Sequence, residues 1–350
     1  YCVDGKNRMT VRLRNHIAEK AKITPFSTLE NDLKISHTTI RKIFLEEVES
    51  LPSLGELETP RILGIDEICL MANNDYKRKQ PWAVIANGEE RTVMDMLKDR
   101  SKPSIIRALQ SLQKPNNVEV VTMDMWSGYR NAVYETLPNA IVVIDKFHIV
   151  KMLTEQLDNM RRRYSRLGPA ELKRNRAIFL MREDKLTPYA RDLRQQWFNE
   201  YPKLETACRL TENFYKIYDS PNRQEAEERY LDWKKSIPYN DSEFNGYSMI
   251  TSTIRRCEKE VFNYFDAPET NAFVEGLNSV IRGIATQGRG YDFDVLRGKV
   301  LFTAGRRCEM PPVDYHWTSM MYKIELPKIT DYGIPFESIL DAIQSGCYKI

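Results

Sequence analysis

The sequence predicts an α/β protein in which a mixed five-stranded sheet with helices is preceded by a small helical domain and interrupted by a helical insertion. Three observations favour this fold class. Apolar, β-branched segments alternate with turn residues and helical segments between residues 61 and 150. Residues 151–261 are rich in charges and aromatics and poor in glycine, with helical patterns throughout. This stretch is too long for a loop inside a compact domain.

Residues 1–50 are predicted to form a small domain with three short helices between about Arg8 and Glu49. Ser36 suits the N-cap of the last helix. A helix, a tight turn and a second helix form the pattern of a helix-turn-helix, whose second helix enters the major groove of DNA. The candidate DNA contacts on that helix are Thr38, Arg41 and Lys42. Because the net charge of this region is close to zero, a helical bundle that contacts another protein is the alternative.

Residues 51–60 contain two prolines and a glycine and are predicted to be a linker. The next segment, 61–150, should form the first part of the core, with strands at 62–71, 81–86, 92–97, 118–123 and 141–144. Asn87-Gly88 is a strong hairpin signal between the second and third strands. Three antiparallel strands, a helix, then strand-helix-strand-helix is the element order of the ribonuclease-H-like fold. In that fold the first and fourth strands lie side by side.

The core is expected to resume at residues 262–305, where an apolar-periodic segment predicts a helix around Glu275. The insertion, 151–261, would then be a separate helical domain. Residues 306–350 form a C-terminal tail whose prolines interrupt any regular pattern, and the sequence indicates no role for it.

Three acidic residues stand where a two-metal site for DNA chemistry would need them. Asp66 lies in the first predicted strand, Asp124 directly follows the fourth, and Glu275 lies on the late helix. An unpaired carboxylate beside a buried strand is costly, which favours a ligand role over a structural one. Magnesium demands hard oxygen ligands, and a metal pair clamps the attacking and leaving oxygens of a phosphoryl displacement. We therefore predict that these three catalytic residues bind two Mg²⁺ ions per site, with Mn²⁺ as a substitute.

Other acids compete with these three. Glu67 is expected to face the opposite side of its strand. Asp145 is interpreted as the N-cap of the following helix in preference to a fourth ligand. Asn271 and Asn278 flank Glu275 at helical spacing and give that helix one polar face, which favours Glu275 over the glutamates near it.

Basic residues gather locally although the formal net charge is only +3. From Arg161 to Arg182 there are eight Lys or Arg against one acid, and from Arg282 to Arg307 there are six against two. Such stretches suit a phosphate backbone, although solvated helix faces are the alternative. The candidate contacts within them are Arg161, Arg162, Arg163, Arg282 and Arg289.

Three further candidates for DNA contact follow Asp124 and Asp145 in the chain. Trp126 could stack on an unpaired base, although a tryptophan packed against the sheet is as common. His148 and Lys151 share one face of the predicted helix and could contact phosphate. A structural histidine is the alternative at the first of these positions.

Composition narrows the cellular setting. Six cysteines are scattered without a C-x-x-C pair, which argues against a complete zinc site and for reduced thiols in the cytoplasm. No apolar run approaches the roughly 20 residues that span a bilayer, so no membrane is expected. The chain opens at Tyr1, so we expect natural sequence to be missing upstream, and Cys2 could be the last ligand of a zinc module lost with it.

Longer motifs surround the three acids. They read ILGIDE at Asp66, VTMDMWSGYRNAVYETLPNAIVVIDKFHIVKML around Asp124, and TNAFVEGLNSVIRGIATQGRGYDFDVLRGKVLF around Glu275. These motifs resemble the bacterial insertion-sequence transposases of the DDE type, of the ISL-three family, over most of residues 10–305. Family members usually carry a zinc-binding module before the helix-turn-helix, and these residues hold none.

The resemblance implies a DNA transposase with a ribonuclease-H-like core and the metal-binding triad Asp66, Asp124 and Glu275. Its expected partners are transposon ends and target DNA, with a homodimer or larger assembly when two ends are synapsed. Its expected location is the bacterial cytoplasm, at the nucleoid. Two alternatives remain: a nuclease on the same fold, such as a junction-resolving enzyme, and a domesticated DNA-binding regulator. The presence of all three acids counts against the regulator.

Overall fold

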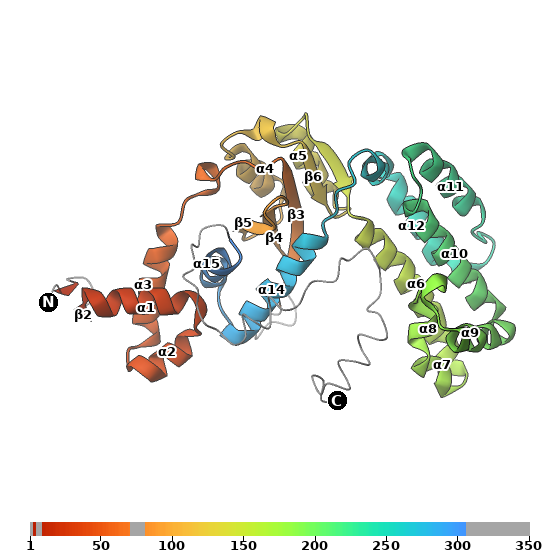
Figure 1. The fold of residues 1–350 in the computed structure, drawn as a ribbon, viewed down its shortest axis with the longest axis horizontal. Coiled ribbons are helices and arrows are strands. Elements are labelled where there is room, and N and C mark those ends of the chain that lie inside the picture. Colours follow the sequence, from red (N-terminus) through yellow and green to blue (C-terminus); the bar gives the residue numbers. More distant parts are fainter. Residues whose placement is uncertain (1–2, 5–8, 71–80, 306–350) are drawn as a thin grey trace. The chain divides into compact units, whose positions relative to one another are not determined.

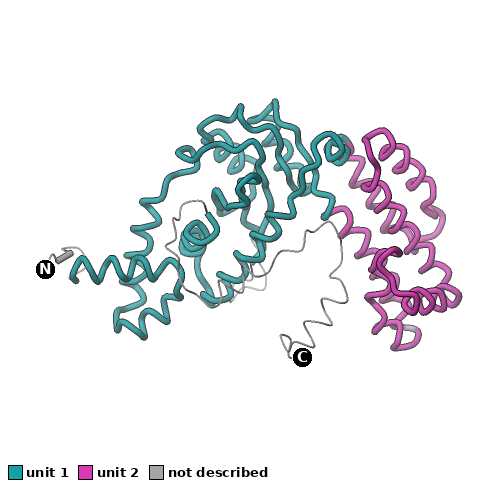
Figure 2. The backbone as a smooth tube through the Cα atoms, in the orientation of Figure 1, with its two compact units in different colours: residues 1–147, 259–311 teal, residues 148–258, 312–350 magenta. Residues whose placement is uncertain are grey.

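The chain forms two compact units in a computed structural model that describes residues 3–4, 9–70 and 81–305 (Figure 2). Unit 1 comprises residues 1–147 and 259–311, and unit 2 comprises 148–258 with 312–350. The predicted tail, 306–350, and the predicted end of the first strand at Met71 lie outside the described residues.

The centre of unit 1 is a five-stranded mixed sheet with the strand order β5-β4-β3-β6-β7. Its strands are β3 (Ile62–Cys69), β4 (Pro81–Asn87), β5 (Thr92–Leu97), β6 (Val120–Met123) and β7 (Ile141–Ile144). β3 pairs antiparallel with β4 and β4 with β5, whereas β3 with β6 and β6 with β7 are parallel. The first and fourth predicted strands are therefore neighbours, and the sheet is consistent with the predicted ribonuclease-H-like core.

Local signals explain the hairpin between β4 and β5. The Asn87 Oδ1 atom accepts hydrogen bonds from the backbone N–H groups of Glu89 at 2.9 Å and Glu90 at 3.0 Å. Arg91 then adopts a left-handed conformation, with φ of 55°. Asparagine side chains that bond to the backbone ahead of them favour such turns, and the predicted hairpin is confirmed.

Helices α14 (Ala272–Gly288) and α15 (Phe293–Thr303) cover one face of this sheet (Figure 1). Their apolar residues form one buried cluster with side chains of β3, β4 and β5. Gly64 on β3 permits the close approach of α14, because a Cβ atom there would lie 2.5 Å from Val274 Cγ2 and 2.9 Å from Asn271 Oδ1. Helices α4 (Lys102–Gln110) and α5 (Ser127–Thr136) pack against each other beside β6.

The three predicted N-terminal helices are present as α1 (Val11–Ile23), α2 (Phe26–Leu33) and α3 (His37–Glu49). The Ser36 Oγ atom accepts a hydrogen bond from Thr39 N at 3.3 Å, so the predicted N-cap is confirmed. These helices share an apolar cluster with Val295 and Phe302 of α15. The buried amine of Lys299 also donates to the carbonyl oxygens of Ala21 at 2.7 Å and Thr24 at 2.8 Å, which ties α15 to the end of α1.

The described part of unit 2 consists of helices and short 3₁₀ turns. The helices are α6 (Lys146–Leu167), α7 (Ala170–Arg174), α8 (Arg176–Leu180), α9 (Pro188–Glu200), α10 (Pro202–Tyr218), α11 (Arg223–Lys235) and α12 (Asn245–Arg255), and α13 (Glu258–Phe262) leads back into unit 1. Buried aromatic residues such as Phe214, Trp233 and Tyr247 form its interior. Within the ranges that the structure describes, no helix has the length and apolar character needed to cross a membrane.

Candidate active site

Three neighbouring parallel strands bring three aspartates into one row across the sheet, which we call the acid row. The register pairs Ile65 of β3 with Met123 of β6, and Met123 with Ile144 of β7. The residues that follow these three are Asp66, Asp124 and Asp145. Because adjacent strands lie about 4.8 Å apart, the three aspartates are neighbours across β3, β6 and β7.

Two buried asparagines hold α14 across the acid row. The Asn271 Oδ1 atom accepts a hydrogen bond from Thr122 Oγ1 at 2.8 Å, and Asn278 Nδ2 donates to Asp66 Oδ2 at 2.9 Å. Glu275 follows Asn271 by four residues and precedes Asn278 by three, so it shares their face of the helix. The predicted polar face of α14 is therefore present and turned toward the aspartates.

Alternation along β3 separates Asp66 from Glu67. Asp66 projects from the same face as Gly64, which is the face that α14 covers. Glu67 projects from the opposite face, where it forms an ion pair with Arg100. The expectation that Glu67 points away from Asp66 is confirmed.

Burial and neighbouring charge raise the pKa of Asp66 to about 7. Burial is the largest cause, since the residue is only 3% exposed. The hydrogen bond from Glu67 N to Asp66 Oδ1, 2.8 Å long, lowers the pKa, whereas the charges of Asp124, Glu275 and Asp145 raise it. Asp66 therefore interacts electrostatically with both of the other predicted ligands.

The chemistry of this donor set fits a divalent cation. It consists of carboxylate oxygens, which are the ligands that Mg²⁺ prefers, and their mutual repulsion would be relieved by positive charge. As they stand, the described side chains form no group of three or more His, Cys, Asp or Glu residues that could hold a metal ion. Asp124 and Glu275 are partly exposed, so rotation of their side chains toward an ion needs no repacking of the core.

Asp145 has a second role besides the predicted one. Its Oδ1 atom accepts a hydrogen bond from Phe147 N at 3.3 Å at the start of α6, as an N-cap does. Its side chain is also only 1% exposed, and its charge raises the pKa of Asp66. The carboxylate therefore belongs to the acid row as well as to the helix start.

Trp126 packs at the start of α5, immediately after the acid row. Its ring lies 4.7 Å from the ring of Tyr129, edge to face, and 5.0 Å from the guanidinium of Arg100. Gly128 makes room for it, because a Cβ atom there would lie 2.2 Å from the indole. These contacts support the structural alternative, while the ring remains partly exposed beside Asp124.

The remaining candidates of unit 1 lie at the surface. Thr38 and Lys42 are exposed on α3, and Arg282 is exposed on α14. Arg289 is the exposed C-cap of α14, with a left-handed φ of 48°. Arg41 forms an ion pair with Asp292, the N-cap of α15, at 2.7 Å, so part of its charge is already matched within the protein.

Arg161 is a correction to the predicted DNA contacts. It is 2% exposed, and its guanidinium donates to Asp158 Oδ1 from Nε at 2.8 Å and to the carbonyl of Leu172 from Nη1 at 3.0 Å. A buried guanidinium with these partners cannot reach a phosphate, so Arg161 is structural. Arg162 and Arg163 are exposed on the same helix, as is Lys151, whereas His148 is half-buried.

Three residues with clear roles in these clusters were not singled out from the sequence. Thr122 anchors Asn271, Asp158 holds the arginines, and Tyr129 places a buried hydroxyl behind Trp126. Helical spacing from Asp158 to Arg161 and Arg162 was a usable signal for the arginine cluster. No local pattern identifies the other two, because the partner of Thr122 lies 149 residues away and the burial of the Tyr129 hydroxyl is decided by tertiary packing.

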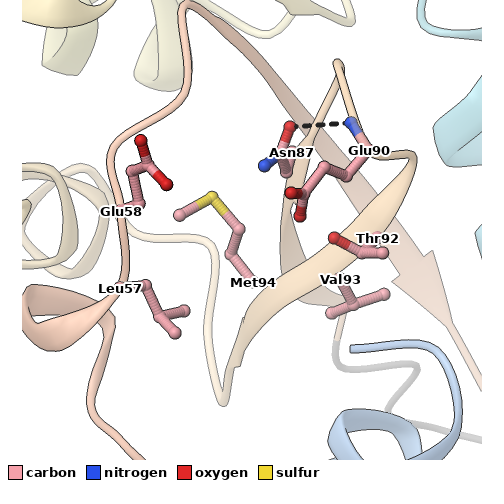
Figure 3. Close-up of a pocket in the computed structure, with 7 residues that line it drawn as sticks. All are labelled: Leu57, Glu58, Asn87, Glu90, Thr92, Val93 and Met94. Atoms are coloured by element: carbon pink, nitrogen blue, oxygen red, sulfur yellow. Dashed lines mark hydrogen bonds between the residues drawn. The ribbon is translucent and has the colours of Figure 1, made fainter. Parts of the chain in front are cut away.

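A hollow between residues 57–58 and the β4–β5 hairpin is separate from the acid row (Figure 3). It is lined by Leu57, Glu58, Asn87, Glu90, Thr92, Val93 and Met94. Asn87 pairs with Leu63 near the start of β3, whereas Asp66 pairs with Val84 further along. The lining contains none of the acids of the candidate site, so the hollow is not part of that site.

Comparison with known proteins identifies the family of the chain. No curated protein matches the chain significantly. A family model described as a transposase, of the DDE type and the ISL-three family, matches residues 63–300. The matched span exceeds half of the 350 residues and includes Asp66, Asp124 and Glu275. The chain therefore belongs to the ISL-three family of DDE transposases.

Proposed function

We propose that this protein cleaves DNA at transposon ends and joins the freed end to target DNA, using two Mg²⁺ ions held by Asp66, Asp124 and Glu275. The observation that carries the proposal is the row of Asp66 within β3, Asp124 after β6 and Asp145 after β7, with α14 fixed across it by Asn271 and Asn278. Membership of a transposase family supports DNA as the substrate.

Asp66 and the two buried asparagines would prepare the site to bind cations. Asp66 has a raised pKa, so a proton would leave it when a cation arrives, and the resulting carboxylate would be a ligand. Asn278 fixes the orientation of Asp66 Oδ2, and Asn271 fixes the helix that presents Glu275. When bound, divalent cations supply activation of the attacking oxygen and neutralisation of the charge on the phosphoryl group.

The reaction would consist of two displacements in the same site. Water first attacks a phosphodiester at the transposon end, one P–O bond forms while another breaks, and a 3′-hydroxyl leaves. That hydroxyl then attacks a target phosphodiester, again with one bond formed and one broken. Because the acids hold cations and do not attack phosphorus, we expect no covalent protein–DNA intermediate.

We assign DNA binding to surfaces in both units. In residues 1–50, α3 would act as the recognition helix of a helix-turn-helix, with 51–60 as the linker to the core at 61–150 and 262–305. In the helical insertion, 151–261, exposed arginines would contact the backbone. The proposed contacts are Thr38, Arg41, Lys42, Trp126, His148, Lys151, Arg162, Arg163, Arg282 and Arg289. Synapsis of two ends would require a homodimer or larger assembly, acting at the nucleoid in the bacterial cytoplasm.

One experiment separates this function from its alternatives. The protein is incubated with Mg²⁺ and labelled DNA that carries the ends of its own element, and the products are resolved by size. We expect both cut and joined products. Cut products without joined ones would favour a nuclease on the same fold, and binding without cutting would favour a DNA-binding regulator.

A further inference from the structure

Tyr129 on α5 buries a hydroxyl that the packing of its ring does not require. The side chain is fully buried, and among the described residues no hydrogen-bond partner is found for the hydroxyl. The ring itself is well accommodated, at 4.7 Å from the Trp126 ring with an interplanar angle of 86°. Burying a hydroxyl without a partner costs stability, so a phenylalanine would serve the ring packing better.

The hydroxyl lies in the electrostatic field of the acid site. Burial, the largest cause, raises the pKa of Tyr129 well above its usual range, and the charges of Asp124, Glu67 and Asp66 raise it further. The hydroxyl therefore keeps its proton and is a hydrogen-bond donor. Of these three charges, that of Asp124, five residues earlier, raises the pKa of Tyr129 most. The Oδ1 atom of Asp124 accepts a hydrogen bond from Trp126 N at 2.9 Å.

The other two acids are less suitable acceptors. Both oxygens of Asp66 already accept hydrogen bonds, from Glu67 N at 2.8 Å and from Asn278 Nδ2 at 2.9 Å. Glu67 forms an ion pair with Arg100. Asp124 is partly exposed and follows the end of β6, so its side chain has room to turn.

We propose that Tyr129 is a positioning residue, whose hydroxyl donates a hydrogen bond to the Asp124 carboxylate when that carboxylate turns to bind a divalent cation. One carboxylate oxygen would then face the cation while the other accepts from Tyr129. Hydrogen bonds of this kind fix the orientation of a ligand, and their removal typically weakens metal affinity about 10–100-fold. This inference rests on the proposed function, because it assumes that Asp124 is a ligand.

The substitution Tyr129→Phe removes the hydroxyl and keeps the ring. In the metal-free protein, loss of a buried hydroxyl that has no partner should leave the melting temperature unchanged or raise it. In the metal-bound protein, the same change removes the donor to Asp124 and should weaken binding. A purely structural tyrosine would not produce effects of opposite sign in the two states.

Tyr134 provides a matched control on the same helix. Its hydroxyl donates to Glu260 at 2.7 Å, so Tyr134→Phe removes a bonded hydroxyl away from the acid row. We expect a lower melting temperature for this variant with an unchanged affinity for Mn²⁺.

The experiment is a Mn²⁺ titration of the full chain, followed by electron paramagnetic resonance of the free ion, for the wild type and both variants. We expect the dissociation constant of Tyr129→Phe to rise about 10-fold or more. If that variant binds Mn²⁺ as tightly as the wild type, the inference is overturned while the proposed function stands. If the wild type binds no Mn²⁺, the proposed function itself fails.

A second measurement on the wild type does not depend on the folding of any variant. With ¹³C-labelled tyrosine, the Cζ resonance of Tyr129 should shift when Mg²⁺ is added, because its hydroxyl gains an acceptor. Binding of Mg²⁺ without any change in that resonance would overturn the inference.

Discussion

Asp66 in unit 1 and Asp158 in unit 2 are aspartates of nearly equal burial, 3% and 4% exposed, whose pKa values shift in opposite directions. Burial alone would raise both. At Asp66 burial is the largest cause, the nearby carboxylates add to it, and the pKa rises to about 7. At Asp158 the hydrogen bonds and charges of Arg161 and Arg176 outweigh burial, and the pKa is lowered.

The comparison shows how neighbouring charge determines what each cluster can bind. The acid row gathers negative charge, which favours a cation. The Asp158 cluster sets three guanidiniums against one carboxylate, with Arg162 and Arg176 59% and 57% exposed in their side chains. The surplus positive charge at that surface suits phosphate. The surroundings of Asp66 thus suit the proposed catalysis, and those of Asp158 suit the proposed binding of DNA.

The largest expected effect is the loss of catalysis when one of the three proposed metal ligands is neutralised. Asp66→Asn, Asp124→Asn and Glu275→Gln should each abolish cleavage and leave end binding largely intact, because each removes a ligand charge with little change in size. Gel assays of cutting, joining and binding measure this. Glu119→Gln is the control, since Glu119 is exposed and pairs with Arg61. A triad variant that cuts and joins at a near-normal rate would make its residue structural.

The second effect is a loss of stability when the arginine cluster loses its carboxylate. Asp158→Asn leaves the buried guanidinium of Arg161 without its countercharge, which should lower the free energy of unfolding of unit 2 by about 3–5 kcal/mol. Urea denaturation measures the change. Arg162→Gln is the control, because loss of its exposed ion pair should cost no more than about 1 kcal/mol. Equal stability of Asp158→Asn and the wild type would remove the basis of the comparison.

The third effect is a dependence of stability on pH that comes from Asp66. Its pKa is about 7 in the folded protein and near 3.8 in the unfolded chain, so the folded state binds more protons between these values. Stability of the metal-free protein should therefore fall as the pH rises from about 4 to about 7.

Asp66→Asn removes this dependence. The free energy of unfolding of this variant should match that of the wild type near pH 4 and should exceed it by up to about 4 kcal/mol near pH 8. Thermal unfolding without metal across this range, compared between the two proteins, provides the measurement. Parallel pH profiles would show that Asp66 is ionised in the folded protein despite its burial.

The smallest effect concerns phosphate binding by unit 2. Replacing Arg162 and Arg176 by Gln should weaken binding to any duplex about equally, and should reduce the salt dependence by about one unit of slope per lost contact. Binding across salt concentrations, on cognate and scrambled duplexes, measures both quantities. Arg209→Gln, an exposed arginine on α10, is the control. An unchanged slope in the double variant would assign these arginines to protein structure alone.

Elements bounded by strong local signals were predictable from the sequence. The strands at 92–97 and 141–144 have the predicted bounds, and the Ser36 N-cap and the Asn87-Gly88 hairpin are where turn and capping preferences place them. The neighbouring positions of Asp66 and Asp124 follow from the predicted element order, because the first and fourth strands lie side by side, whereas the place of Asp145 beside them was not predicted.

Features that depend on distant partners were not predictable. Arg161 lies in the same basic run as Arg162 and Arg163. It differs from them in the structure, because its guanidinium donates to the carbonyl of Leu172 and pairs with the buried Asp158. The ion pair of Arg41 joins residues 251 positions apart in the chain, so α3 alone gives no indication of it. Side-chain direction and burial are decided by packing, and a helical pattern leaves them open.

The central claim is that Asp66, Asp124 and Glu275 bind divalent cations together. A crystal of the protein soaked with Mn²⁺ and measured by anomalous diffraction tests it most directly, because the signal locates the ions among the carboxylates. We predict two ions about 3.5–4 Å apart, both bound by these three residues. Ions bound elsewhere, Asp145 in place of Glu275, or an ordered core that keeps the three carboxylates more than roughly 10 Å apart would contradict it.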